Sequence, residues 1–155
     1  MNAIFSMISG KLYDKIGAKL PVRLGFLLAA AATILLLFTS ATSPAWYVIL
    51  CHMLLLTGVP MAMAPSQTSG LASLPGELSA DGSTILNTMQ QVWGAVCTAV
   101  ATSLLGIGQL AYSGEDIGER FTNGFHYGIA FTLVLAIAGF AVSFALREKK
   151  NTLSS

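Results

Sequence analysis

Four long apolar stretches, separated by shorter polar ones, dominate the chain. They cover approximately residues 22–39, 45–63, 84–107 and 125–146. About twenty apolar residues in a helix cross the hydrocarbon core of a bilayer, so each stretch predicts one complete membrane span. A further apolar stretch, residues 1–9, is too short to cross and predicts only the end of a span. The pattern therefore predicts an all-α, polytopic transmembrane helix bundle over residues 1–150: four complete spans, the end of a fifth, and then a polar tail at 151–155.

The polar stretches between these spans predict the connections. Residues 42–44 contain a proline after two small polar residues and predict a tight turn. Residues 66–83 are small and polar and predict a surface loop, with at most a short helix at 67–74. Residues 108–124 hold four charges and predict a second loop.

The composition fits a membrane protein and argues against several soluble functions. The chain is 54% hydrophobic and only 10% charged, whereas soluble domains carry roughly 25% charged residues. No basic face is present that would neutralise nucleic-acid phosphates. The sequence contains no phosphate-binding loop, no nucleophile motif and no pair of buried carboxylates, so we expect no enzymatic activity. Cys51 and Cys97 lie within apolar stretches, where we expect no disulfide.

The basic residues predict the orientation of the spans. If residues 10–19 lie in the cytoplasm, seven of the eight Lys and Arg residues fall on the cytoplasmic side, and only Arg120 lies outside. The positive-inside rule favours this arrangement. The sequence thus predicts a multi-pass protein of the cell membrane with a cytoplasmic C-terminus. The seven cytoplasmic residues are Lys11, Lys15, Lys19, Arg23, Arg147, Lys149 and Lys150.

A charged loop at residues 10–19 precedes the first complete span. Its glycines allow a tight turn, and its lysines suit the cytoplasmic face of a membrane. The spacing resembles the cytoplasmic signature of the major facilitator superfamily, in which glycine, leucine, aspartate and basic residues recur. The matching residues are Gly10, Leu12, Asp14, Lys15, Gly17 and Lys19.

This resemblance implies a position within a longer protein. In the family the signature occurs once in each half of the transporter, and the four spans that follow it here match the second copy. The chain would then be the C-terminal third of a transporter, and its partner would be the missing N-terminal half. The resemblance also implies that Asp14 latches one conformation through a charge-assisted contact. An ordinary solvated loop acid is the alternative for Asp14.

A narrower likeness concerns the third span. The run Asp81-Gly82-Ser83, followed by Asn87, Gln90, Gln91, Gly94 and Ala99, resembles a segment near the end of the fourteen-span drug:proton antiporters. This implies a secondary active transporter that exports multiple drugs or other small molecules by alternating access. A proton gradient, rather than a bound cofactor, would drive it. In such transporters the second complete span lines the cavity.

Several residues inside the spans are candidates for function. Asn87, Gln90, Gln91 and Gly94 share one face at helical spacing and predict either a helix interface or part of a cavity. His52 lies in the middle of the second span, where an ionisable residue suggests function, although a neutral histidine bonded to a neighbouring helix is the favoured interpretation.

Two further features of the second span concern a metal and a hinge. His52 and its neighbours Cys51 and Met53 point about 100° apart in a helix, so we expect no metal site. Gly58 and Pro60 interrupt the same span, and because proline removes a helical hydrogen bond they predict a hinge.

An independent four-helix membrane protein is the alternative to a transporter fragment. Such a protein would pair with a second copy, either as a dimeric exporter or as an assembly subunit without transport activity. A small proton-coupled exporter is expected to carry an acidic residue inside a span. None of the four predicted spans contains one, which counts against the exporter.

Overall fold

The computed structural model describes residue 17 and residues 19–144, which form four long helices. These are α2 (Lys19–Leu37), α3 (Ala45–Ala72), α4 (Ser79–Ala111) and α5 (Ile117–Ser143), with a short 3₁₀ turn, η1 (Gly76–Leu78), between α3 and α4. All four long helices have the length and composition needed to cross a membrane. The prediction of an all-α transmembrane bundle is therefore confirmed. The predicted end of a fifth span, residues 1–9, lies outside the described residues.

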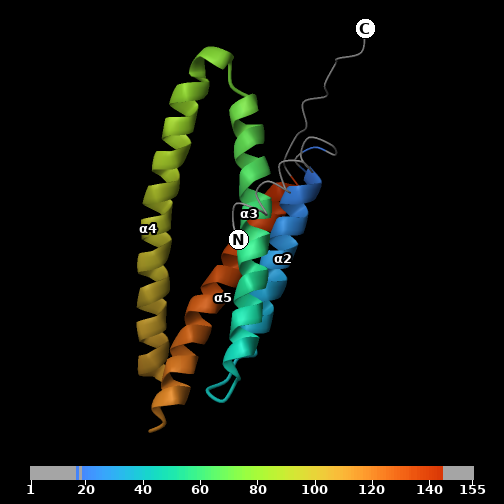
Figure 1. Ribbon diagram of the computed structural model, residues 1–155. Coiled ribbons are helices and arrows are strands. Elements are labelled where there is room, and N and C mark those ends of the chain that lie inside the picture. Colours follow the sequence, from blue (N-terminus) through green and yellow to red (C-terminus); the bar gives the residue numbers. More distant parts are fainter. Residues whose placement is uncertain (1–16, 18, 145–155) are drawn as a thin grey trace.

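The helices form an open arrangement rather than a closed bundle. α2 packs against both α3 and α5, and α5 packs in turn against α4. α3 and α4 are close only near the turn that joins them, where Leu71 and Leu74 lie against Gly82. Away from this turn α4 stands apart from α3 (Figure 1). The order of neighbours is thus α3, α2, α5, α4, with a gap between the first and the last.

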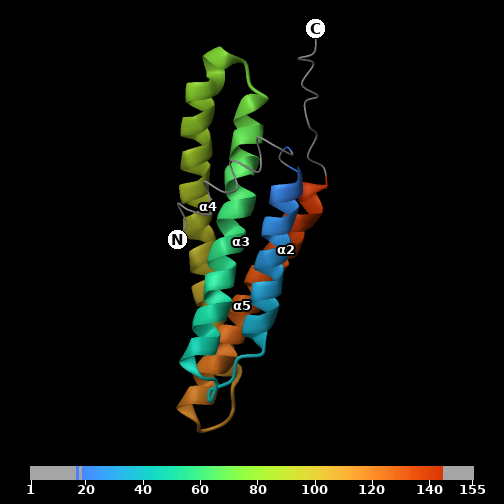
Figure 2. The ribbon, with the colours of Figure 1, turned by 45° about the vertical axis from the view of Figure 1, so that its right-hand side comes forward.

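The two ends of the bundle differ in what they contain (Figures 1 and 2). One end, here the Lys19 end, holds the start of α2, the α3–α4 turn and the end of α5. The other, the Ser43 end, holds the loops at 38–44 and 112–116. Every charged side chain of the described residues lies in or near these two ends, so the middle of each helix is uncharged.

Glycines bring α2 and α3 into close contact. A Cβ atom at Gly58 would lie 2.7 Å from the Gly25 carbonyl oxygen and 2.7 Å from the Ala29 nitrogen, so a methyl group does not fit at this crossing. Small residues allow such backbone approach, and this close packing is what holds helices together in lipid. Thr33, fully buried beside this crossing, donates its hydroxyl to the Ala29 carbonyl of its own helix at 2.9 Å. The polar group is therefore satisfied without a partner helix.

A second glycine pair joins α4 to α5 near the Ser43 end. A Cβ atom at Gly108 would lie 2.8 Å from the Gly124 Cα atom. The Asn123 amide donates a 2.6 Å hydrogen bond to the Gly108 carbonyl across the same contact. The His126 Nε2 atom lies 2.7 Å from the Thr39 carbonyl oxygen, which links α5 to the end of α2. Side chains of α5 thus bind a backbone carbonyl of α4 and one in the segment just after α2.

The connections are shorter than the sequence predicts. The expected surface loop at 66–83 is wrong, because α3 continues to Ala72, which takes in most of the expected short helix at 67–74, and α4 begins at Ser79. The expected loop at 108–124 is reduced to residues 112–116. Asp81, which falls in this expected loop, lies in the first turn of α4, where an acid interacts favourably with the helix dipole. Pro65 lies inside α3. Membrane helices tolerate an internal proline when neighbouring groups bond to the backbone carbonyl that the proline leaves without a donor.

Candidate functional site

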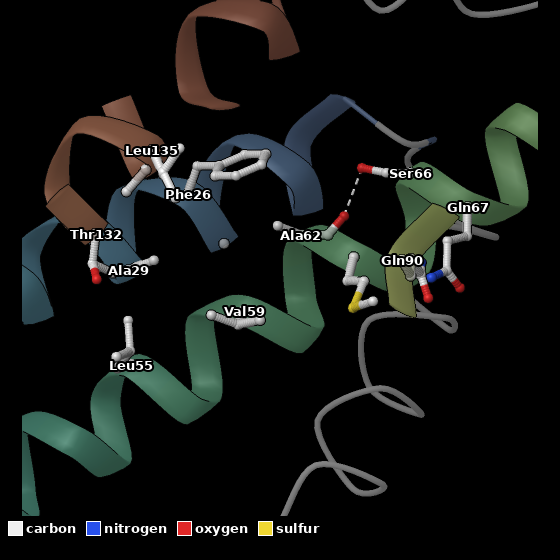
Figure 3. A pocket seen from close by; sticks show the side chains of 13 residues that line it. Phe26, Ala29, Leu55, Val59, Ala62, Ser66, Gln67, Gln90, Thr132 and Leu135 are labelled. Atoms are coloured by element: carbon white, nitrogen blue, oxygen red, sulfur yellow. Dashed lines mark hydrogen bonds between the residues drawn. The ribbon is translucent and has the colours of Figure 1, made fainter. Parts of the chain in front are cut away.

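All four long helices line a cavity of about 420 Å³ (Figure 3). This volume lies within the range typical of small-molecule sites, roughly 300–1,000 Å³. α2, α3 and α5 supply most of its wall, and α4 contributes a single side chain, that of Gln90. The lining residues are Gly25, Phe26, Ala29, Leu55, Val59, Ala62, Met63, Ser66, Gln67, Gln90, Thr132, Leu135 and Ala136.

The wall is apolar over most of its area because of the spacing of residues on α3. Leu55, Val59, Ala62, Met63 and Ser66 recur at intervals of three and four, so one face of α3 points into the cavity along several turns. α2 and α5 add small residues and the ring of one phenylalanine opposite this face (Figure 3). Such a surface suits the apolar body of a ligand.

Four lining residues are polar, and they divide into two kinds. The Ser66 hydroxyl donates to the Ala62 carbonyl at 2.7 Å, and the Thr132 hydroxyl donates to the Gly128 carbonyl at 3.1 Å. Both hydroxyl protons are therefore used within their own helices. Gln67 and Gln90 are half-buried, and neither amide forms a hydrogen bond with another described residue.

A second hollow of about 360 Å³ adjoins the first along α3. Leu55, Val59, Met63 and Gln67 line both spaces, which makes this stripe of α3 the common wall. Pro60 lines only the second hollow. Together the two spaces extend along this one face of α3.

The structure separates the polar candidates of α4. Of the four residues predicted to share a face, only Gln90 lines the cavity, while Asn87, Gln91 and Gly94 are exposed. His52 is exposed on α3 and does not line either hollow. Their roles as cavity or interface residues stay predictions. Within the described part of the chain, no group of three or more His, Cys, Asp or Glu side chains could hold a metal ion.

The proposed hinge and latch residues are placed only in part. Gly58 and Pro60 are both buried, and α3 is an unbroken helix through them. Gly17 has a φ of 79°, the left-handed region that favours glycine, and Lys19 begins α2. The other four members of the motif, Gly10, Leu12, Asp14 and Lys15, lie outside the described residues.

Sequence reasoning missed the cavity residues on α2 and α5, and it assigned Gln67 to a surface loop. The spacing of Leu55, Val59, Met63 and Gln67 at intervals of four would have placed Gln67 on the same helical face. The four-residue interval continues past Pro65, and this continuation is the sequence signal that places Gln67 in the helix. Phe26 and Thr132 carry no comparable signal, because only tertiary packing brings α2 and α5 to α3.

Comparison with known proteins identifies the family. A model of the Major Facilitator Superfamily matches residues 1–98. The chain belongs to the Major Facilitator Superfamily. The predicted family is therefore confirmed, and members of this family are multi-pass membrane transporters rather than enzymes. No solved structure matches the chain.

Curated relatives agree with this assignment. The chain is similar to the lincomycin resistance protein LmrB of Listeria monocytogenes, with 35% identity over 97% of the chain and 33% of the relative. The protein of the same name from Bacillus subtilis is 34% identical over 97% of the chain and 33% of its length. YcnB, an uncharacterised MFS-type transporter of Bacillus subtilis, is 31% identical over 94% of the chain and 31% of its length.

Two of these relatives are named for resistance to a drug, which agrees with the predicted likeness to drug transporters. The chain spans about one third of the length of the curated relatives it matches.

Proposed function

We propose that the chain is the C-terminal part of a secondary active transporter that exports drugs or other small molecules across the cell membrane. The observation that carries this proposal is the cavity of about 420 Å³ between four membrane-length helices, in a chain related to named resistance proteins. Its apolar wall suits lipophilic substrates. In the complete transporter this third works together with the remaining two thirds.

The proposed mechanism is alternating access, in which one helical bundle rocks against another around a central site. Close glycine contacts join α2 to α3 and α4 to α5, so each pair is suited to move as a unit. The gap between α3 and α4 is the side on which the remaining helices of the transporter would pack. Export is coupled to a proton gradient through carboxylates supplied by those other helices.

The proposed orientation places the Lys19 end in the cytoplasm. Lys19 and Arg23 lie at this end, and five further basic residues precede α2 or follow α5 in the sequence. Asp14, in the loop before α2, is then the cytoplasmic latch. In the complete transporter, Asp14→Asn is expected to slow export while the amount of inserted protein is unchanged. Equal export rates would remove the latch from the mechanism.

A chimera tests the transporter assignment. The third of the Bacillus subtilis lincomycin resistance protein that matches this chain is replaced by this chain and expressed in a susceptible host. We expect severalfold higher tolerance of lincomycin than with the same relative lacking that third. Insertion is checked by an affinity tag in the membrane fraction. A chimera that inserts normally and confers no added tolerance to any drug of a panel would contradict the proposal.

The chain expressed alone provides the comparison with the independent four-helix alternative. We expect no export activity from the 155-residue chain in liposomes with an imposed proton gradient. Proton-coupled flux from the purified chain by itself would favour a small exporter that works as a dimer.

A further inference from the structure

The two glutamines of the cavity lie on the helices that border the gap. Gln67 comes from α3 and Gln90 from α4, and both line the same cavity (Figure 3). Each side chain is half-buried, and neither amide is bonded to another of the described residues. A ligand held between them would touch both α3 and α4, which otherwise meet only near their connecting turn.

The energetics favour a ligand that pairs with these amides. A polar group without a hydrogen-bond partner is costly in an apolar environment. Ser66 and Thr132 avoid this cost by donating to carbonyls of their own helices. The longer side chains of Gln67 and Gln90 end in the cavity region instead, so their hydrogen bonds are available to a molecule that enters it.

The chemistry of a carboxamide defines the matching group. Each glutamine offers two N–H donors and one carbonyl acceptor. An amide or hydroxyl group of a ligand can both donate to and accept from such a pair. A cation or anion finds no opposite charge, because none of the thirteen described lining residues is charged, and an ion would lose its hydration on entry.

We propose that the cavity binds an uncharged molecule with an apolar body and one amide or hydroxyl group, which is held between Gln67 and Gln90. The apolar body lies along the face of α3 formed by Leu55, Val59 and Met63. The proposal names the class of ligand for the proposed transport function, and its biological role rests on that function. Binding itself is a property of this chain and can be measured without transport.

Three probes of similar shape test the ligand class: benzanilide, which carries a neutral amide, stilbene, which has no polar group, and N-methyl-4-styrylpyridinium, which is a cation. Equilibrium dialysis compares phosphatidylcholine nanodiscs that contain the full chain with empty nanodiscs. After subtraction of lipid partitioning, we expect benzanilide to bind roughly five- to a hundredfold more tightly than stilbene, because each of two net hydrogen bonds contributes about two- to tenfold. We expect the cation to bind more weakly than either neutral probe.

Three variants assign the effect to the two amides. Gln67→Leu and Gln90→Leu are each expected to lower benzanilide affinity by about two- to tenfold, toward that of stilbene, while stilbene binding persists and shows that the cavity is intact. Gln91→Leu is the matched control, because Gln91 is an exposed neighbour on α4 that does not line the cavity. It should leave all three affinities unchanged.

The ranking of probes on the unaltered chain decides the proposal even if a variant fails to fold. Equal binding of benzanilide and stilbene, tighter binding of the cation, or no binding above that of empty nanodiscs would each overturn it. The transporter assignment fails by a different result, namely a properly inserted chimera without export, so the two failures are distinguishable.

Discussion

Replacing Gly58 by alanine tests whether this residue is a packing contact between α2 and α3 or a hinge within α3. The added Cβ atom would lie 2.7 Å from the Gly25 carbonyl oxygen, 2.7 Å from the Ala29 nitrogen and 3.0 Å from the Leu28 Cβ atom. Two of these atoms belong to the backbone of α2, which cannot rotate away as a side chain can. The helices must therefore move apart.

The required movement sets the size of the effect. Ordinary van der Waals contact begins at 3.4 Å, so the contacts at 2.7 Å require a separation of about 0.7 Å. A gap of 0.5–1 Å forfeits about a quarter to a half of the dispersion energy of each atom pair across it. Overpacking of this kind costs typically about 1–3 kcal/mol. We expect the Gly58→Ala chain to lose about 2 kcal/mol of stability.

Unfolding of the purified chain in mixed micelles by increasing SDS, followed by circular dichroism, measures this loss. Gly94→Ala is the matched control, because a Cβ atom there has no atom within 4 Å outside its own helix backbone. We expect the control to be as stable as the original chain or up to about 1 kcal/mol more stable, because alanine favours a helix interior over glycine. If Gly58→Ala also unfolds at the unchanged SDS fraction, the close contact is not a source of stability. Loss of export when Gly58→Ala is introduced into the chimera, with the stability of the chain unchanged, would instead favour a hinge at this position.

Other contacts at the Ser43 end give three smaller tests. Asp116 caps α5 by accepting the Glu119 N–H at 2.8 Å, so Asp116→Ala should cost about 1 kcal/mol in the same assay, and Asp116→Asn much less. His126→Ala removes the bond to the Thr39 carbonyl and should cost about 1 kcal/mol, whereas an unchanged midpoint would show that this bond contributes nothing. With the native cysteines replaced, cysteines introduced at Ser43 and in the loop at 112–116 should both react with an impermeant thiol reagent from outside intact cells. Labelling of only one would contradict the proposed topology.

The number and type of elements follow from the sequence because apolar length is a strong signal. Each of the four stretches exceeds what a soluble core helix needs, and each forms one helix. The helix ends are less predictable. Pro65 and the small polar residues after it resemble a loop by composition, yet α3 continues through them to Ala72. Within a bilayer a helix satisfies its own backbone groups, so a single proline such as Pro65 does not end α3.

The cavity is predictable only in part. Gln90 was identified because amides in a span must find partners, and Gln67 was not, because its assignment to a loop removed it from the helical face. Phe26 and Ala29 become lining residues only when Gly25 and Gly58 set how closely α2 approaches α3. Sequence periodicity defines the faces of one helix, whereas a cavity depends on how several helices are spaced.

The face of α4 that carries Asn87, Gln91, Gly94 and Thr98 has no helix packed against it among the described residues. Thr98 satisfies its hydroxyl by donating to the Gly94 carbonyl at 2.8 Å, but Asn87 and Gln91 are exposed, with no hydrogen bond to another described residue. Amides facing lipid are unfavourable, and small residues such as Gly94 permit close approach of another helix. Because the relatives are about three times as long as this chain, we expect this face of α4 to pack against the remaining part of the transporter. The same packing would close the gap between α3 and α4 and complete the wall of the cavity that Gln90 now lines from one side.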